Sequence, residues 1–88
     1  MKYVYPALFQ SSDGGYCVTF PDVEGAITCG DTLPQAVEMA HDALALMLVR
    51  MEDRGEKIKA PTPPEKVRRE DGDMVMLVSA DTEAYRRA

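Results

Sequence analysis

The segment that decides the fold is residues 20–32, which read Phe-Pro-Asp-Val-Glu-Gly-Ala-Ile-Thr-Cys-Gly-Asp-Thr. Its first half predicts a rigid turn. Pro21 fixes its own φ angle, the Asp22 carboxylate can accept hydrogen bonds from the amides that follow it, and Gly25 permits the chain to reverse. We therefore expect one strand to end at Phe20 and another to begin after Gly25.

The second half of the segment predicts a short strand and then a helix. Ala26–Cys29 is rich in strand-forming side chains, and Gly30 ends this run. Thr32 and Gln35 match a capping box, in which the Thr32 hydroxyl accepts from the Gln35 amide while the Gln35 side chain reaches back. A helix is expected to begin at this point.

Upstream of the segment, the pattern predicts a β-hairpin. Residues 3–10 alternate as a strand does, and Pro6 within this run indicates an edge or a bulge. Gly14 and Gly15 lie in a turn cluster and can adopt positive φ angles, and residues 16–20 alternate again. Together with the short strand at 26–29, the hairpin would form a three-stranded meander.

Downstream, the predicted helix runs to about Arg54, and Gly55 is placed to cap it in the left-handed conformation. The stretch from Ala43 to Val49 contains no polar residue, which makes a wider apolar sector than one sheet face needs to cover. This sector is expected either to lie deep in the domain or to meet another chain.

The remaining residues predict a connector and a fourth strand. Residues 56–72 contain three prolines among charged side chains and are expected to form an extended connector without chemistry. Met74–Val78 is a continuous apolar run that suits a central strand buried on both faces. Asp81 can cap a short helix, although that helix would have nothing to pack against. The predicted fold is α+β, with the meander, one long helix and the fourth strand in one sheet, in the order β-β-β-α-β.

Length and charge restrict the function. The chain has 88 residues, which is room for a single domain. Ten basic residues against fifteen acidic ones give a net charge of −5, which repels polyphosphate. We therefore expect no direct contact with nucleic acid and favour a small basic protein as partner.

Other sequence features predict neither a cofactor nor a membrane location. Cys17 and Cys29 lack CxxC spacing, so we expect free, partly buried thiols and neither a zinc site nor a disulfide framework. His41 has no nucleophile at helical spacing and is expected at the surface. No signal peptide or membrane-spanning run is evident, so a cytoplasmic location is expected.

Two alternatives remain open at this point. Asp13, Asp22, Glu24 and Asp31 could hold a divalent metal in a nuclease of degenerate ribonuclease-H type. Turn chemistry and proximity to a helix N-terminus account for Asp13 and Asp31, so we predict no catalytic and no metal-binding residue. The second alternative is an orphan regulatory module that dimerises through residues 43–49.

An ordered motif resembles a known family. Residues 13–25 follow the pattern D-G-G-Y-x-V-x-F-P-D-x-x-G, and residues 28–36 continue as T-x-G-D-T-x-x-Q-A. The two together resemble the HicB-type antitoxin family, with Gln35 where that family usually has glutamate. The likeness extends over nearly all of residues 1–79. The residues that we take to define the fold are Gly14, Gly15, Phe20, Pro21, Asp22, Gly25, Gly30, Asp31 and Thr32.

The resemblance implies a function and a partner. It implies a partial ribonuclease-H-like fold without catalytic acids, which masks the active site of a small HicA-type mRNA-cleaving toxin. Residues 1–79 would form this toxin-neutralising domain, and residues 80–88 would be a short tail where a DNA-binding segment normally begins. A homodimer or higher oligomer is expected. We place candidate partner contacts on exposed carboxylates and apolar positions, namely Asp22, Glu24, Leu46 and Val49.

Overall fold

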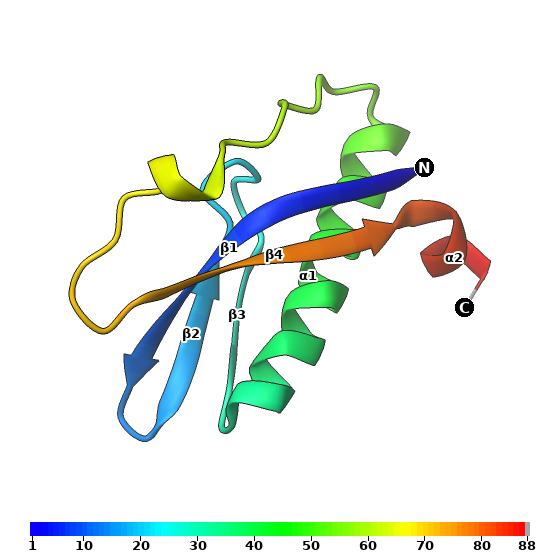
Figure 1. The fold of residues 1–88 in the computed structure, drawn as a ribbon. Coiled ribbons are helices and arrows are strands. Elements are labelled where there is room, and N and C mark those ends of the chain that lie inside the picture. Colours follow the sequence, from blue (N-terminus) through cyan, green and yellow to red (C-terminus); the bar gives the residue numbers. More distant parts are fainter. Residues whose placement is uncertain (88) are drawn as a thin grey trace.

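The computed structural model describes residues 1–87, which form a four-stranded antiparallel sheet and two helices (Figure 1). The strands lie in the order β3-β2-β1-β4. The predicted α+β class and the β-β-β-α-β order of the sheet and the long helix are confirmed. The elements in chain order are β1 (Lys2–Ser12), β2 (Gly15–Thr19), β3 (Ile27–Gly30), α1 (Leu33–Asp53), a 3-10 turn (Pro64–Lys66), β4 (Met74–Asp81) and α2 (Thr82–Arg87).

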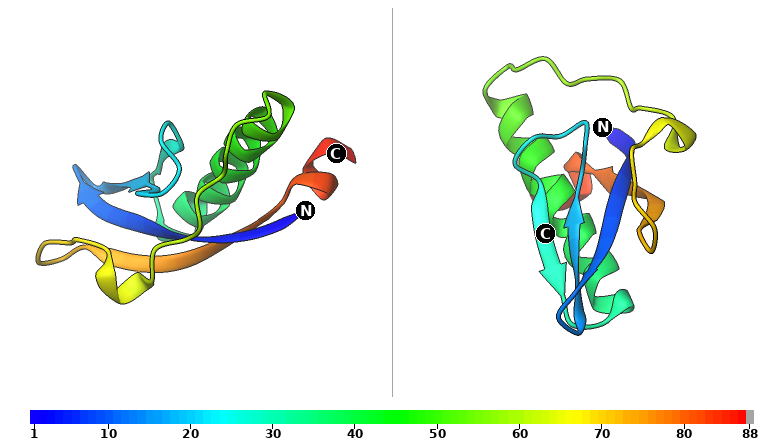
Figure 2. Two further views of the ribbon diagram at one scale, coloured as in Figure 1. Left: turned by 90° about the horizontal axis from the view of Figure 1, so that it is seen from above. Right: turned by 90° about the vertical axis from the view of Figure 1, so that its left-hand side faces the viewer.

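The core lies between α1 and one face of the sheet (Figure 2). Alternate residues of β1, including Tyr5 and Phe9, point toward the helix and are buried, as the strand pattern predicts. Leu44 and Leu48 of α1 meet them and are fully buried. The absence of a side chain at Gly30 allows the N-terminal end of α1 to lie close to β3.

Pro6 occupies a part of β1 that has a strand on one side only. β2 pairs with β1 from Leu8 to Ser12, whereas β4 pairs with β1 from Lys2 to Phe9. The missing N–H of Pro6 therefore removes no bond to β2, which does not extend that far. The expectation of an edge-like position for Pro6 is confirmed, although β1 as a whole is a central strand.

The prediction that Met74–Val78 forms a central strand is wrong. β4 lies at the edge of the sheet and pairs only with β1. Val78 and Ala80 face the helix and are buried, whereas Leu77 on the other face is 59% exposed. A continuous apolar run indicates a strand, but it does not show whether both faces of that strand are covered.

Both predicted ends of α1 are confirmed. The Gln35 amide donates to Thr32 Oγ1 at 3.2 Å, so Thr32 caps the N-terminus. At the other end Gly55 has a φ of +67°, and the Glu56 amide donates to the Met51 carbonyl at 3.0 Å. These bonds satisfy backbone groups that a helix end otherwise leaves without partners.

The expectation that the C-terminal helix packs against nothing is wrong. Asp81 caps α2 as predicted, since its Oδ1 accepts from the Glu83 and Ala84 amides at 3.0 and 3.3 Å. α2 then packs against α1, and Arg86 donates to the Val49 carbonyl. The wide apolar sector of α1 is thus partly covered by the chain's own C-terminal helix.

The connector between α1 and β4 is fixed to the domain at several points. It passes from the helix side of the sheet to the opposite side, where it forms the 3-10 turn (Figure 2, left). The Tyr5 hydroxyl donates to the Lys59 carbonyl, and Val67 is buried. The connector is extended as predicted, but its side chains and backbone help to hold the fold.

Candidate partner-binding surface

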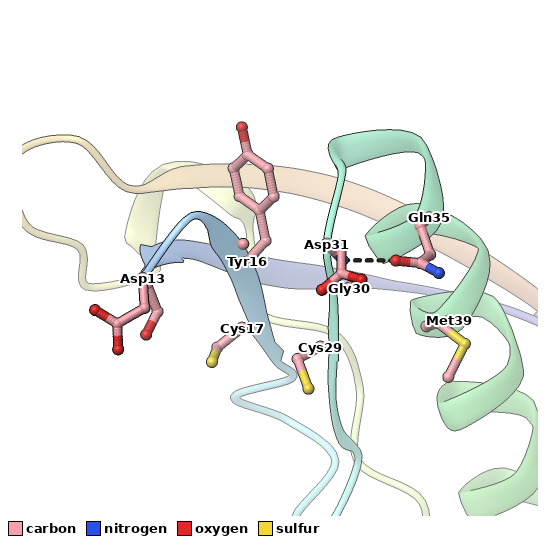
Figure 3. A pocket seen from close by; sticks show the side chains of 10 residues that line it. Asp13, Tyr16, Cys17, Cys29, Gly30, Asp31, Gln35 and Met39 are labelled. Carbon is pink, nitrogen blue, oxygen red and sulfur yellow. Dashed lines mark hydrogen bonds between the residues drawn. The ribbon is translucent and has the colours of Figure 1, made fainter.

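The connection from β3 to α1 is short and consists of Gly30, Asp31 and Thr32, which bring the two elements close together. Gln35 Oε1 accepts from the Asp31 amide at 2.6 Å, so the predicted reach-back of Gln35 ends one residue before the cap (Figure 3). A Cβ atom on Gly30 would lie 2.6 Å from the Ala36 nitrogen, which is closer than side chains tolerate. The motif here sets how closely the helix approaches the sheet.

Gly14 and Gly15 form the tip of the β1–β2 hairpin for two different reasons. Gly14 has a φ of +82° and follows Asp13 at +43°, so the turn needs residues that tolerate the left-handed region. Gly15 is required for space, since a Cβ there would lie 2.8 Å from the Gly30 carbonyl oxygen. The two halves of the motif therefore contact each other in the fold.

The turn from Phe20 to Gly25 is held by its own backbone. The Val23 amide donates to the Phe20 carbonyl, and the Ala26 amide donates to the Val23 carbonyl, each at 3.1 Å. Phe20 and Val23 are buried, and Gly25 has a φ of +91° as the chain reverses. Pro21 is exposed at the start of this turn.

Asp22 does not lie on an exposed surface, which corrects the expectation that placed it there. The residue is 6% exposed, and its carboxylate oxygens accept from the Thr62 amide at 2.7 Å and from the Thr62 hydroxyl at 2.6 Å. The Lys59 ammonium lies 3.8 Å away. Asp22 therefore fastens the connector to the turn of the motif.

The other candidate contact residues lie on two sides of α1. Leu46 and Val49 are half-buried, and the helical period places them on the side of α1 that points away from the sheet. Glu24 is exposed and borders a hollow of about 350 Å³ beside Met47 and Met51. The structure brings Leu46 and Val49 to one face, while Glu24 borders another side of the helix.

A second hollow, of about 410 Å³, lies beside the hairpin tip and the start of α1 (Figure 3). Asp13, Asp31, Cys17 and Cys29 are among the side chains that line it. Both cysteines are free and both are exposed, so the expectation of partial burial is wrong. His41 is exposed, as expected, and its Nδ1 lies 2.7 Å from the Ser79 carbonyl oxygen.

Sequence reasoning missed a polar cluster that ties the two ends of the chain to α1. Glu52 accepts from the Tyr3 hydroxyl at 2.7 Å and from Arg86 at 3.2 Å. Thr82 Oγ1 lies 3.1 Å from the same Glu52 carboxylate, and the Thr82 amide donates to the Met1 carbonyl at 3.0 Å. The sheet continues to Asp81, past the boundary predicted at residue 79.

Because of the Tyr3–Glu52 contact, we expect the free energy of unfolding to fall as the pH rises above 10. Burial, together with the hydrogen bond to Glu52 and its charge, raises the pKa of Tyr3 from 10.0 to about 12. The unfolded chain releases this proton near pH 10, so the contribution is complete below pH 10 and is lost as pH rises toward 12. Urea unfolding at a series of pH values would show the loss.

Two substitutions control this prediction. Tyr3→Phe should make the loss of stability between pH 10 and about 12 less steep. Part of it should remain, because burial also raises the pKa of Tyr5. Tyr85→Phe, on the exposed side of α2, should leave the pH dependence unchanged. An unchanged pH dependence in Tyr3→Phe would contradict the role of the Tyr3 hydroxyl.

The described residues offer no metal site. No three histidine, cysteine, aspartate or glutamate side chains among residues 1–87 are grouped so that they could hold a metal ion. The carboxylates of Asp13, Asp22, Glu24 and Asp31 therefore do not form the centre that the nuclease alternative requires.

Within residues 1–87, no helix is both long and apolar enough to cross a membrane.

Several known proteins with similar sequences or folds are antitoxins. A family model described as HicB_like antitoxin of bacterial toxin-antitoxin system matches residues 5–88. Antitoxin HicB 1 of Photorhabdus laumondii is 43% identical over 60 residues, which are 67% of this chain and 39% of that protein. The matched part therefore covers less than half the length of that relative.

Two solved structures share the fold. A toxin–antitoxin complex from Streptococcus pneumoniae contains a chain that superposes with a TM-score of 0.85 at 22% identity, over 97% of this chain and 73% of that one. The N-terminal domain of Burkholderia pseudomallei HicB gives 0.77 at 25% identity, over 90% and 99%. The resemblance of the motif to HicB proteins is thus confirmed, and the chain belongs to the HicB-like antitoxins of bacterial toxin–antitoxin systems.

Proposed function

We propose that this chain is a non-enzymatic antitoxin domain that binds and masks a small, basic HicA-type RNA-cleaving toxin. The observation that carries the proposal is the match of the antitoxin family model to residues 5–88. The solved relative from Streptococcus pneumoniae is itself a toxin–antitoxin complex. Binding of this kind would take place in the bacterial cytoplasm, where the toxin would meet its RNA.

Charge supports a basic partner. The chain carries a net charge of −5, and complementary charge speeds association and suppresses wrong partners. An RNA-cleaving toxin needs a basic face to hold phosphates, and that face would be attracted to an acidic antitoxin. Masking the basic face would exclude RNA without any chemistry from the antitoxin.

The outward side of α1 fits this partner best. Glu38 and Asp42 are exposed along it, and the half-buried Leu46 and Val49 lie on the same side. Apolar side chains surrounded by charged ones are typical of the centre and rim of a protein interface. Glu24, on the other side of the helix, would then contribute at the rim or not at all.

We expect Asp42→Lys to weaken toxin binding about 10- to 100-fold, because it places a like charge against the basic partner. Co-expression with a HicA-type toxin, followed by co-purification and titration, measures the effect. Native mass spectrometry of the purified complex also counts the copies of each chain, which tests the proposed homodimer. Leu46→Glu is expected to act in the same direction.

Asp71→Lys is the matched control. It makes the same change of charge on an exposed residue before β4, away from the helix. We expect this variant to bind as tightly as the unmodified chain within about threefold, since a remote surface charge is screened by salt. Failure of the unmodified chain to co-purify or to rescue growth would contradict the proposed function. Equal losses in Asp42→Lys and Asp71→Lys would contradict the proposed surface alone.

A further inference from the structure

Cys17 and Cys29 form an exposed pair of thiols on neighbouring strands. They are directly opposite each other in the antiparallel ladder of β2 and β3. Side chains at directly opposed positions point to the same face of a sheet, and Figure 3 shows both cysteines leaving their strands on the same side. Both residues are free and exposed.

The spacing of such a pair suits a disulfide. Opposed residues in an antiparallel ladder have Cα atoms about 5.5 Å apart at hydrogen-bonded positions and about 4.5 Å apart at the others. Disulfides span Cα separations of about 4.4–6.8 Å, so both kinds of position fall within reach. β3 is an edge strand, so its pairing with β2 is the only strand pairing that has to adjust when the bond forms.

We propose that Cys17 and Cys29 are a redox modification site that closes into a cross-strand disulfide by exchange with a neutral or cationic low-molecular-weight disulfide. One thiolate attacks the reagent, forms a mixed disulfide and releases the first small thiolate. The second cysteine, deprotonated, attacks the protein sulfur of that mixed disulfide and releases the second small thiolate. The protein loses two electrons and two protons, and the reagent is reduced to two thiols.

The surroundings of the pair select the reagent. The hollow of about 410 Å³ beside the two thiols admits a small molecule and is also lined by Asp13 and Asp31. These two carboxylates repel an anionic disulfide and attract a cationic one. The net charge of −5 on the whole chain acts in the same direction. Access for the reagent is open because both cysteines are exposed.

Closure would tie the edge strand to the sheet. The bond joins β2 to β3 across the turn from Phe20 to Gly25, so it restricts the unfolded chain and raises the melting temperature. The bond also prevents β3 from separating from β2. Because α1 follows directly after β3, the start of α1 is held near the sheet as well. Reduction by a small thiol reverses the change.

The experiment treats the folded chain with cystamine, which is cationic, with hydroxyethyl disulfide, which is neutral, and with glutathione disulfide, which is anionic. Intact mass spectrometry should show monomer that has lost two hydrogen atoms and carries no adduct. Cys17→Ser and Cys29→Ser should each retain one adduct, because the second thiol is missing. The closed form should melt about 5 °C or more above the reduced form, and the single variants should show no such rise.

The rates test the proposed surroundings. Cystamine should react at least about tenfold faster than glutathione disulfide at low ionic strength, and salt should reduce this difference. Asp31→Asn, which keeps both thiols, should reduce the ratio of the reaction rate with cystamine to the reaction rate with glutathione disulfide. Two stable adducts on the unmodified chain, covalent dimers, or closure no faster in the folded protein than in urea would each overturn the proposal.

Discussion

Gly30→Ala should unfold the domain or cost about 3 kcal/mol or more in the free energy of unfolding. A Cβ atom at this position would lie 2.6 Å from the Ala36 nitrogen and 2.8 Å from its Cα, both of which belong to the backbone of α1. Backbone cannot rotate away as a long side chain can, so β3 and α1 must separate. Overpacking in a well-filled interior costs about 1–3 kcal/mol even where side chains relax. Urea unfolding followed by circular dichroism measures the loss.

Gly72→Ala makes the same chemical change without the clash. Gly72 has a φ of +90°, and a Cβ there would meet nothing within 4 Å. The expected cost is about 1–2 kcal/mol, from the left-handed conformation alone. The comparison separates the two reasons for which this chain uses glycine. A smaller loss in Gly30→Ala than in Gly72→Ala would show that α1 can move away from β3 easily.

Features set by neighbouring residues could be predicted from the sequence. The turn after Phe20, the cap at Thr32 and the left-handed residue at Gly55 each depend on bonds within a few residues. Proline, glycine and short polar side chains restrict the backbone directly, so their spacing alone indicates these structures. This is also why the motif identified the family.

Features that join distant residues could not be predicted. Asp22 meets Thr62, and Tyr3 meets Glu52, across long separations in the chain. Each of these polar residues is ordinary in its own stretch of sequence, and only the crossing of the connector and the packing of α1 against β1 bring them together. The order of the strands could not be predicted for the same reason, since an apolar run indicates a strand but not which strands lie beside it.

The same distinction decides which positions of the candidate contact residues could be predicted from the sequence. Helical spacing is local, so the sequence places Leu46 and Val49 within one apolar sector of α1, but it does not decide whether this sector lies deep in the domain or meets another chain. Asp22 was expected on the surface because a carboxylate in a turn usually faces water. Its burial depends on the return of the connector, which supplies two donors from Thr62.

Asp22→Ala should lower the free energy of unfolding by about 2–3 kcal/mol. The substitution leaves the Thr62 amide and hydroxyl without their acceptor in a partly buried site, and a hydrogen-bond donor left unsatisfied there costs about 1–3 kcal/mol. The loss should appear first in the connector, as faster hydrogen exchange around residues 59–62. Urea unfolding gives the global value, and exchange measured by mass spectrometry gives its location.

Glu24→Ala is the control, because it removes an exposed carboxylate from the same turn and should change stability by no more than about 0.5 kcal/mol. Asp22→Asn should fall between the two, since its oxygen can accept from the Thr62 amide and its N–H can donate to Thr62 Oγ1, but the charge that strengthens both bonds is lost. If Asp22→Ala weakened toxin binding while stability and exchange stayed unchanged, Asp22 would be a contact residue after all. If stability fell and the folded fraction still bound the toxin normally, the acidic residue of the family motif would be a fastener of the connector, and the contact with the toxin would have to come from other side chains.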